Sequence, residues 1–337
     1  MEIMATNFTY ASLASLLSAP TSAGPSYQSL SPLAPRVQPP SPMWIAVRER
    51  FTQFNANLTL TPLQQLDGYG KRGGVVNCLN RHYYDSTSET DHSFLIGSWG
   101  KTTAVRPPRD IDTYFLLPPA VYHRFQTHTW NRQSALLQEV KGVLAQTYPD
   151  TDMTGDGQIV LVKFGSYNVE VVPAFELQNG GYWICDTNNG GSYKWTNPWS
   201  EAAHIDTVDK ATNGNLRPLI RMLKAWQTNC SVPIKSFQLE LIAAEFIAQS
   251  PWRLYDYFWF DWITRDFFAY LYHRANGFVT IPGSAEFVAL GDDWRSRCQS
   301  AYDRAVKACD FEKWNLIEDA GDEWEKIFGL QIPRDIS

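Results

Sequence analysis

The sequence predicts an α+β fold, in which a mixed sheet with flanking helices is followed by a helical C-terminal half. Short apolar, β-prone runs recur between residues 92 and 186, and the spacing from about residue 199 onward is typical of helices. With 337 residues, 44% of them hydrophobic, and 13 tryptophans, the chain can bury a large core. This length favours one bilobed unit or two domains, which we expect at residues 43–198 and 199–337.

Residues 1–42 are rich in Ser, Pro and Ala and carry almost no charge. Such a composition rarely packs, so we expect a disordered leader. Because Met43 opens the first helical pattern, a start codon assigned too far upstream is an alternative to a functional tail. A second helix is expected to begin after Thr61 as its N-cap and to continue to Tyr84, with Gly73–Gly74 as a candidate break point.

The predicted sheet follows these helices. Its β-prone runs are residues 92–97, 110–117, 158–164, 167–175 and 182–186. One helix is expected at about residues 122–147, because apolar residues recur there at helical spacing. In the helical half, we expect the aromatic run 255–272 to pack in the core rather than to form a nucleobase or partner surface.

Composition limits the location and the partners. The chain has no apolar run long enough to cross a bilayer and no charged lead to a secretory signal, so we expect a cytoplasmic protein without a membrane partner. Its five cysteines are scattered and lack a C-x-x-C pair, which argues for reduced thiols and against a zinc module. A net charge of −6 indicates that the protein is not built to neutralise a polyanion.

The run G-S-W-G-K-T-T-A-V-R-P-P-R-D-I-D, which starts at Gly97, holds the most informative pattern. Glycine lets the backbone approach a phosphate, Ser98 can donate to it, and Lys101 adds charge nearby. Asp110 and Asp112 are two apart on a β-prone run and therefore share a face. Adjacent carboxylates repel each other unless a cation lies between them, and oxygen ligands suit Mg²⁺. The pattern predicts nucleotidyl transfer with two Mg²⁺ ions, or Mn²⁺ in their place.

A third acid is needed to complete such a metal site. Glu170 lies between valines in the run Y-N-V-E-V-V-P-A-F-E-L and is the candidate, as a catalytic residue and metal ligand together with the two aspartates. Glu176 has the same parity on the strand, so it shares the face and remains the rival.

In this order, the motifs resemble the cGAS/DncV-like nucleotidyltransferases (CD-NTases) of bacterial anti-phage signalling systems. The resemblance covers about residue 44 to the end of the helical half. It is carried by Gly97-Ser98, which we call the Gly-Ser loop, and by the motifs D-I-D, V-E-V-V-P-A, L-I-R-M-L-K-A-W and K-S-F-Q-L-E. It implies a polymerase-β-like core and synthesis of cyclic di- or trinucleotide second messengers from nucleoside triphosphates. Many relatives have Asp where this chain has Glu170.

The resemblance also assigns residues in the helical half. Lys224 and Ser236 match phosphate-binding residues, and Phe237 matches a base-stacking aromatic that is often Tyr in relatives. We expect a regulatory protein partner. Activation by double-stranded DNA is not expected, because the Cys/His zinc insertion with which animal relatives grip DNA has no counterpart in this sequence.

Two other functions remain open at this point. An RNA-end or small-molecule nucleotidyltransferase would use the same carboxylates, although no Lys/Arg run indicates a basic acceptor groove. A catalytically inert binding protein on the same fold is the second alternative, and the intact D-x-D pair argues against it.

Overall fold

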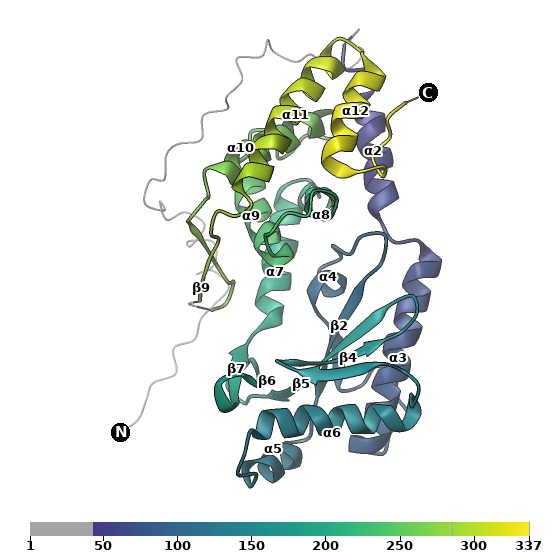
Figure 1. Ribbon diagram of the computed structural model, residues 1–337, viewed down its shortest axis with the longest axis vertical. Coiled ribbons are helices and arrows are strands. Elements are labelled where there is room, and N and C mark those ends of the chain that lie inside the picture. Colours follow the sequence, from purple (N-terminus) through teal and green to yellow (C-terminus); the bar gives the residue numbers. More distant parts are fainter. Residues whose placement is uncertain (1–42, 285, 337) are drawn as a thin grey trace. The chain divides into compact units, whose positions relative to one another are not determined.

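A computed structural model describes residues 43–284 and 286–336 (Figure 1). These residues all belong to one compact unit. The leader predicted for residues 1–42 lies outside the described residues. Among the helices that the structure describes, none combines the length and the apolar character that a membrane span requires. The strands of the main sheet end before Pro198, where the first helix of the helical half begins. This position is next to the predicted boundary, which stays a prediction as a domain border.

The sheet is mixed and has seven strands. Its order is β1-β2-β5-β4-β3, and β6 pairs with both β5 and β7. Only the β2–β5 pair among these strands is parallel. The strands are β1 (Ser93–Leu95), β2 (Asp110–Leu116), β3 (Met153–Asp156), β4 (Ile159–Lys163), β5 (Asn168–Glu176), β6 (Tyr182–Asp186) and β7 (Ser192–Thr196).

Four helices accompany the sheet: α3 (Pro62–Tyr84), α4 (Gly97–Gly100), α5 (Pro119–Gln126) and α6 (Arg132–Thr147). Helix α2 (Val47–Leu58) instead packs against the helical half, where Phe51 contacts Trp324 and Phe54 contacts Phe328. Figure 1 shows α3 and α6 along the sheet, and their apolar residues form one core with its strands. Because side chains alternate along a strand, Phe115 of β2 points into this core while Tyr114 packs in a separate cluster on the other face. Asp110 and Asp112 share the parity of Tyr114.

Helix α3 begins where the sequence predicts. Thr61 accepts a hydrogen bond from the Gln64 amide at 3.2 Å, and the Gln64 side chain accepts one from the Thr61 amide at 3.0 Å, which completes a capping box. The candidate break at Gly73–Gly74 is wrong, since the helix is continuous there. A Cβ on Gly74 would lie 2.6 Å from the Tyr148 hydroxyl, so glycine makes room for a packed neighbour.

Other elements differ from the sequence prediction. The first helix starts at Val47, four residues after Met43. Instead of one helix at 122–147 there are α5 and α6, because Asn131 caps the second helix by accepting a hydrogen bond from Ser134 at 2.9 Å. Strands β3 and β7 were not predicted, since both adjoin Gly-rich, polar turns.

The helical half contains α7 (Pro198–Ala211), α8 (Leu216–Asn229), α9 (Ser236–Gln249), α10 (Phe260–Tyr272), α11 (Arg295–Lys313) and α12 (Ile317–Phe328). Its shorter elements are η2 (Tyr257–Trp259) and the hairpin of β8 (Phe278–Thr280) with β9 (Phe287–Ala289), whereas the short helix η1 (Asn188–Gly190) lies between β6 and β7. Most phenylalanine and tryptophan rings of the aromatic run, such as Phe260 and Phe267, are buried in the core as predicted, whereas Tyr255 at the start of the run is exposed. The five cysteines, all of them within the described residues, form no disulfide with one another.

Candidate active site

The three predicted acids lie on one patch of the sheet. Parallel pairing of β2 with β5 puts Glu170 directly opposite Asp112, and Asn168 opposite Asp110. The side-chain amide of Asn168 donates a hydrogen bond to Asp110 Oδ1 at 2.8 Å. Glu176, the rival acid, is the exposed last residue of β5 and pairs with Tyr182. The geometry therefore favours Glu170.

Crowding of the carboxyl groups changes their titration. Burial, and then the negative charges of Asp112 and Asp110, raise the pKa of Glu170 to about 7. Burial also raises the pKa of Asp112, although a hydrogen bond with Glu170 works in the opposite direction. Two neighbouring carboxyl groups are costly to ionise together, and a cation between them would relieve the repulsion.

Gly97 is packed against this patch. Its φ is +57°, a conformation that side-chain-bearing residues rarely adopt, and a Cβ built on it would lie 1.8 Å from Asp112 Oδ2. The residue before it, Ile96, donates a hydrogen bond from its amide to the Asp112 carbonyl at 3.0 Å. The Gly-Ser loop and the start of β2 therefore fit each other only because residue 97 is glycine.

A cavity of about 280 Å³ brings the two halves of the predicted site together. Eight of the nine predicted site residues line it: Gly97, Ser98, Lys101, Asp110, Asp112, Lys224, Ser236 and Phe237. The ninth, Glu170, contacts Asp112 but does not line the cavity. Phe237 is half-buried at its wall, and the Ser236 hydroxyl donates to Gln227 Oε1 at 2.8 Å.

One residue of this cavity was not predicted. Glu240 is buried, and its two oxygens lie 2.5 Å from Lys101 Nζ and 2.7 Å from Lys224 Nζ. Burial alone would raise the pKa of Glu240, but the two lysines lower it to about 2 and so keep it ionised. Its signal in the sequence was the four-residue spacing from Ser236, which places both on one face of α9.

The arrangement of the three acids can be compared with the ligands that Mg²⁺, the predicted metal, requires. Within the described part of the chain, no group of three or more His, Cys, Asp or Glu side chains already forms a metal cage. Mg²⁺ does not require one, because it commonly binds through one or two carboxylates and completes its shell with waters and substrate phosphates. Asp110 and Asp112 fit that mode together with Glu170, which contacts Asp112, because the mutual repulsion of the three carboxyl groups favours a cation.

Comparison with known proteins finds a family model that matches the part of the chain that carries the acids. Residues 45–209 match the SMODS family, the Second Messenger Oligonucleotide or Dinucleotide Synthetase domain. Residues 45–209 of this chain therefore form a SMODS domain. Its SMODS region extends from the turn before α2 into α7 and so includes β2, β5 and the Gly-Ser loop.

Two curated proteins are similar to this chain. A cyclic AMP-AMP-AMP synthase of Acinetobacter sp. (strain ATCC 27244 / 9458) is 29% identical over 159 residues, which cover 46% of this chain and 45% of that protein. A probable cyclic nucleotide synthase of Bacillus cereus (strain VD146) is 24% identical over 178 residues, covering 49% and 51%. The chain thus spans about half the length of the curated relatives it matches.

Solved structures extend the likeness in fold. DncV, the cyclic AMP-GMP synthase of Vibrio cholerae, has a TM-score of 0.63 at 13% identity, covering 85% of this chain and 96% of that one. CdnC of Escherichia coli MS115-1, in a complex with HORMA, has a TM-score of 0.62 at 18% identity, covering 85% and 98%. This chain shares their fold, which confirms the predicted α+β class.

Proposed function

We propose that this chain is a CD-NTase that acts as a cyclic oligonucleotide synthetase, which converts nucleoside triphosphates into cyclic di- or trinucleotides for anti-phage signalling. The observation that supports the proposal best is the shared cavity, where the Gly-Ser loop and the acids of β2 meet the predicted phosphate-binding and base-stacking residues of α8 and α9. An inert protein on this fold would have no need for adjacent acids whose ionisation the fold opposes.

The donor nucleotide would be held from both sides of the cavity. Gly97, Ser98 and Lys101 would contact its triphosphate, and Lys224 would add positive charge from α8. Phe237 would stack on the base without selecting it, because every base has a π-face. A ribose hydroxyl of the acceptor would then attack the α-phosphorus, and the bond to pyrophosphate would break.

Asp110, Asp112 and Glu170 would hold the divalent cations, two Mg²⁺ or Mn²⁺ ions. Bound there, the ions would supply charge neutralisation and would lower the pKa of the attacking hydroxyl. The carboxylates fix the place of that charge relative to the Gly-Ser loop, since Asp112 packs against Gly97.

Substrate and partner follow from the relatives. One is named a cyclic AMP-AMP-AMP synthase, so ATP is the first substrate to test. A similar structure is a CdnC:HORMA complex, which supports a regulatory protein as a partner of this chain. A cytoplasmic location, where nucleotides and phage-derived cues occur, is part of the same proposal.

The proposal is tested by incubating the full chain with all four nucleoside triphosphates and Mg²⁺. Mass spectrometry of the phosphatase-resistant products should show a cyclic oligonucleotide, and Asp112→Ala should not make it. Transfer of nucleotides only to RNA ends or to a small molecule would favour the alternative enzyme class. Nucleotide binding without any transfer would instead indicate an inert protein.

A further inference from the structure

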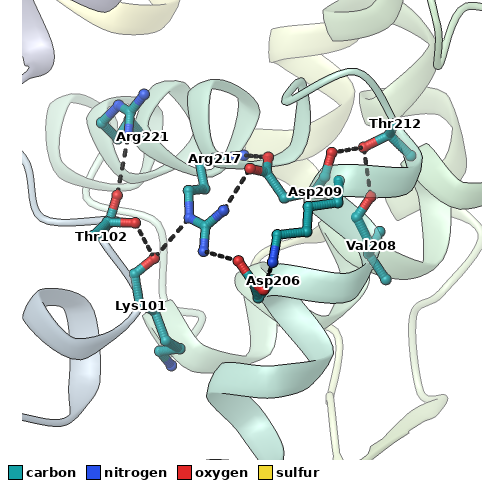
Figure 2. Close-up of polar contacts among 9 residues, drawn as sticks. Lys101, Thr102, Asp206, Val208, Asp209, Thr212, Arg217 and Arg221 are labelled. Carbon is teal, nitrogen blue, oxygen red and sulfur yellow. Dashed lines mark hydrogen bonds and ion pairs between the residues drawn. The ribbon is translucent and has the colours of Figure 1, made fainter.

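Arg217, Arg221 and Lys224 on one face of α8 reach the main chain that follows the Gly-Ser loop. Figure 2 shows the contacts of the two arginines. Their spacing of four and three residues puts them in a row along the helix. Each donates to one of three successive carbonyl oxygens: Arg217 Nε to Lys101 at 3.0 Å, Arg221 Nη1 to Thr102 at 3.1 Å and Lys224 Nζ to Thr103 at 3.0 Å. We call these three cations the α8 latch.

Side chains of two other helices, α7 and α2, orient two of the latch residues. Arg217 forms ion pairs with Asp209 at 2.5 Å and Asp206 at 3.2 Å, both on α7 (Figure 2). Arg221 donates from Nε and Nη2 to Asn55 Oδ1 of α2, at 3.0 and 2.9 Å. Because both guanidinium groups are fixed, the carbonyls they hold are fixed relative to α7, α8 and α2.

The segment held by the latch is closed onto the Gly-Ser loop. Its amides donate back to that loop: Lys101 to the Gly97 carbonyl at 3.2 Å, Thr102 to Trp99 at 3.2 Å and Thr103 to Ser98 at 2.8 Å. Thr102 has a φ of +56°, which costs energy for a β-branched residue and persists only where its surroundings impose it. A shift of residues 101–103 would therefore move residues 97–99.

We infer that Arg217 and Arg221 are positioning residues for nucleotidyl transfer, which hold residues 101–103 and thereby fix the Gly-Ser loop against Asp112. The inference rests on the proposed function. Neither arginine lines the cavity, so both act through the main chain and not on the nucleotide. The contact between Gly97 and Asp112 carries the effect to the acids.

Arg221→Met is the first test, because the described hydrogen-bond partners of Arg221 are uncharged oxygens and its removal leaves no carboxylate unpaired. We expect kcat, measured as pyrophosphate release, to fall by about 10- to 100-fold, since a misplacement near 1 Å has that effect. KM for ATP should change by less than about threefold. Arg221→Lys keeps one donor and should recover part of the loss.

Arg297→Met is the matched control. Arg297 also donates to a carbonyl, that of Cys230 at 2.9 Å, but it does not line the cavity. It should keep the wild-type kcat. Arg217→Lys preserves the charge facing Asp209 and loses the forked geometry that reaches the Lys101 carbonyl, so its kcat should fall as in Arg221→Met.

Amide hydrogen exchange on the nucleotide-free protein supplies a readout that does not depend on activity. In Arg221→Met, exchange of residues 98–103 should quicken by about tenfold or more, while that of α3 and α6 should remain as in the wild type. Unchanged kcat and unchanged loop exchange relative to Arg297→Met would overturn the inference, as would faster exchange throughout the chain. A wild type that makes no cyclic product would overturn the proposed function instead, and the exchange measurement would still decide whether the latch holds the loop.

Discussion

At the scale of single residues, Gly97 and Asp112 depend on each other. Any side chain at position 97 would occupy the place of the Asp112 carboxylate, as the 1.8 Å approach of a built Cβ shows. The loop that is proposed to hold phosphate therefore contacts the acid that is proposed to hold the cation. A substitution at either position should displace the residue at the other.

Asp112→Ala should lower product formation by about a thousandfold or more, because several kcal/mol of charge stabilisation at the reacting phosphate is lost. The same is expected of Asp110→Ala and Glu170→Gln. Melting temperature should not fall in Asp112→Ala, since the variant removes one of the mutually repelling carboxyl groups. Product assays and thermal melts check both statements.

Glu176→Gln is the control for these variants, because Glu176 has the parity of Glu170 but is exposed at the other end of β5. It should retain wild-type activity. If Glu176→Gln is inactive and Glu170→Gln is active, the third acid has been assigned to the wrong carboxylate.

Phe237→Ala should weaken binding of nucleoside triphosphate by about 1–3 kcal/mol, the usual value of one base–aromatic stack. Phe237→Tyr should bind nearly as well, because the ring face is kept. Isothermal titration with ATP measures the change. A sharp loss of melting temperature with unchanged affinity in the folded protein would show that the ring belongs to the core and not to the nucleotide site.

At the scale of elements, hydrophobic patterning predicted the strands that carry the acids. β2 and β5 combine apolar, β-prone residues with acids at alternate positions, which places Asp112 and Glu170 without any knowledge of their partners. The break in the helix at 127–131 and the short strands β3 and β7 were missed. They depend on caps and Gly-rich turns, whose effect is decided by neighbours that lie far away in the sequence.

The candidate site was predictable to the extent that its residues lie in recognisable motifs. Glu240 and the α8 latch were not predicted, because their roles depend on contacts with residues 101–103, which lie more than 100 residues away in the sequence. From the sequence alone, a glutamate on a helix is expected to be a surface or structural residue. Only the fold shows that it is shared by Lys101 and Lys224.

The capping box of α3 gives a prediction at this scale. Thr61→Ala should lower the free energy of unfolding by about 0.5–2 kcal/mol, because it removes the side chain that satisfies the Gln64 amide. Thr52→Ala, which removes only an exposed hydroxyl bonded to the Arg48 carbonyl within α2, should stay within about 0.5 kcal/mol. Urea denaturation of the two variants measures the difference, and equal effects would contradict the capping role.

At the scale of the whole molecule, charge bears on regulation. Duplex DNA is bound through many Lys/Arg–phosphate contacts, whereas this chain has a net charge of −6. We expect no stimulation of product synthesis by long double-stranded DNA, at low or at moderate salt. Synthesis assays with and without DNA check this, and a large, salt-sensitive rise would reveal a basic surface that the net charge conceals.

The parallel pairing of β2 with β5 also has a kinetic meaning. Asn168 and its bonded partner Asp110 are 58 residues apart in the chain, and Glu170 stands in the same relation to Asp112. Closing so long a loop has an entropic cost that must be met before the contacts it allows can form, and non-local pairing of this kind slows folding. We expect the acids to come together late, after α6 and the β3–β4 hairpin between them have formed. A nascent chain would then have no assembled carboxylate cluster until β5 has joined the sheet.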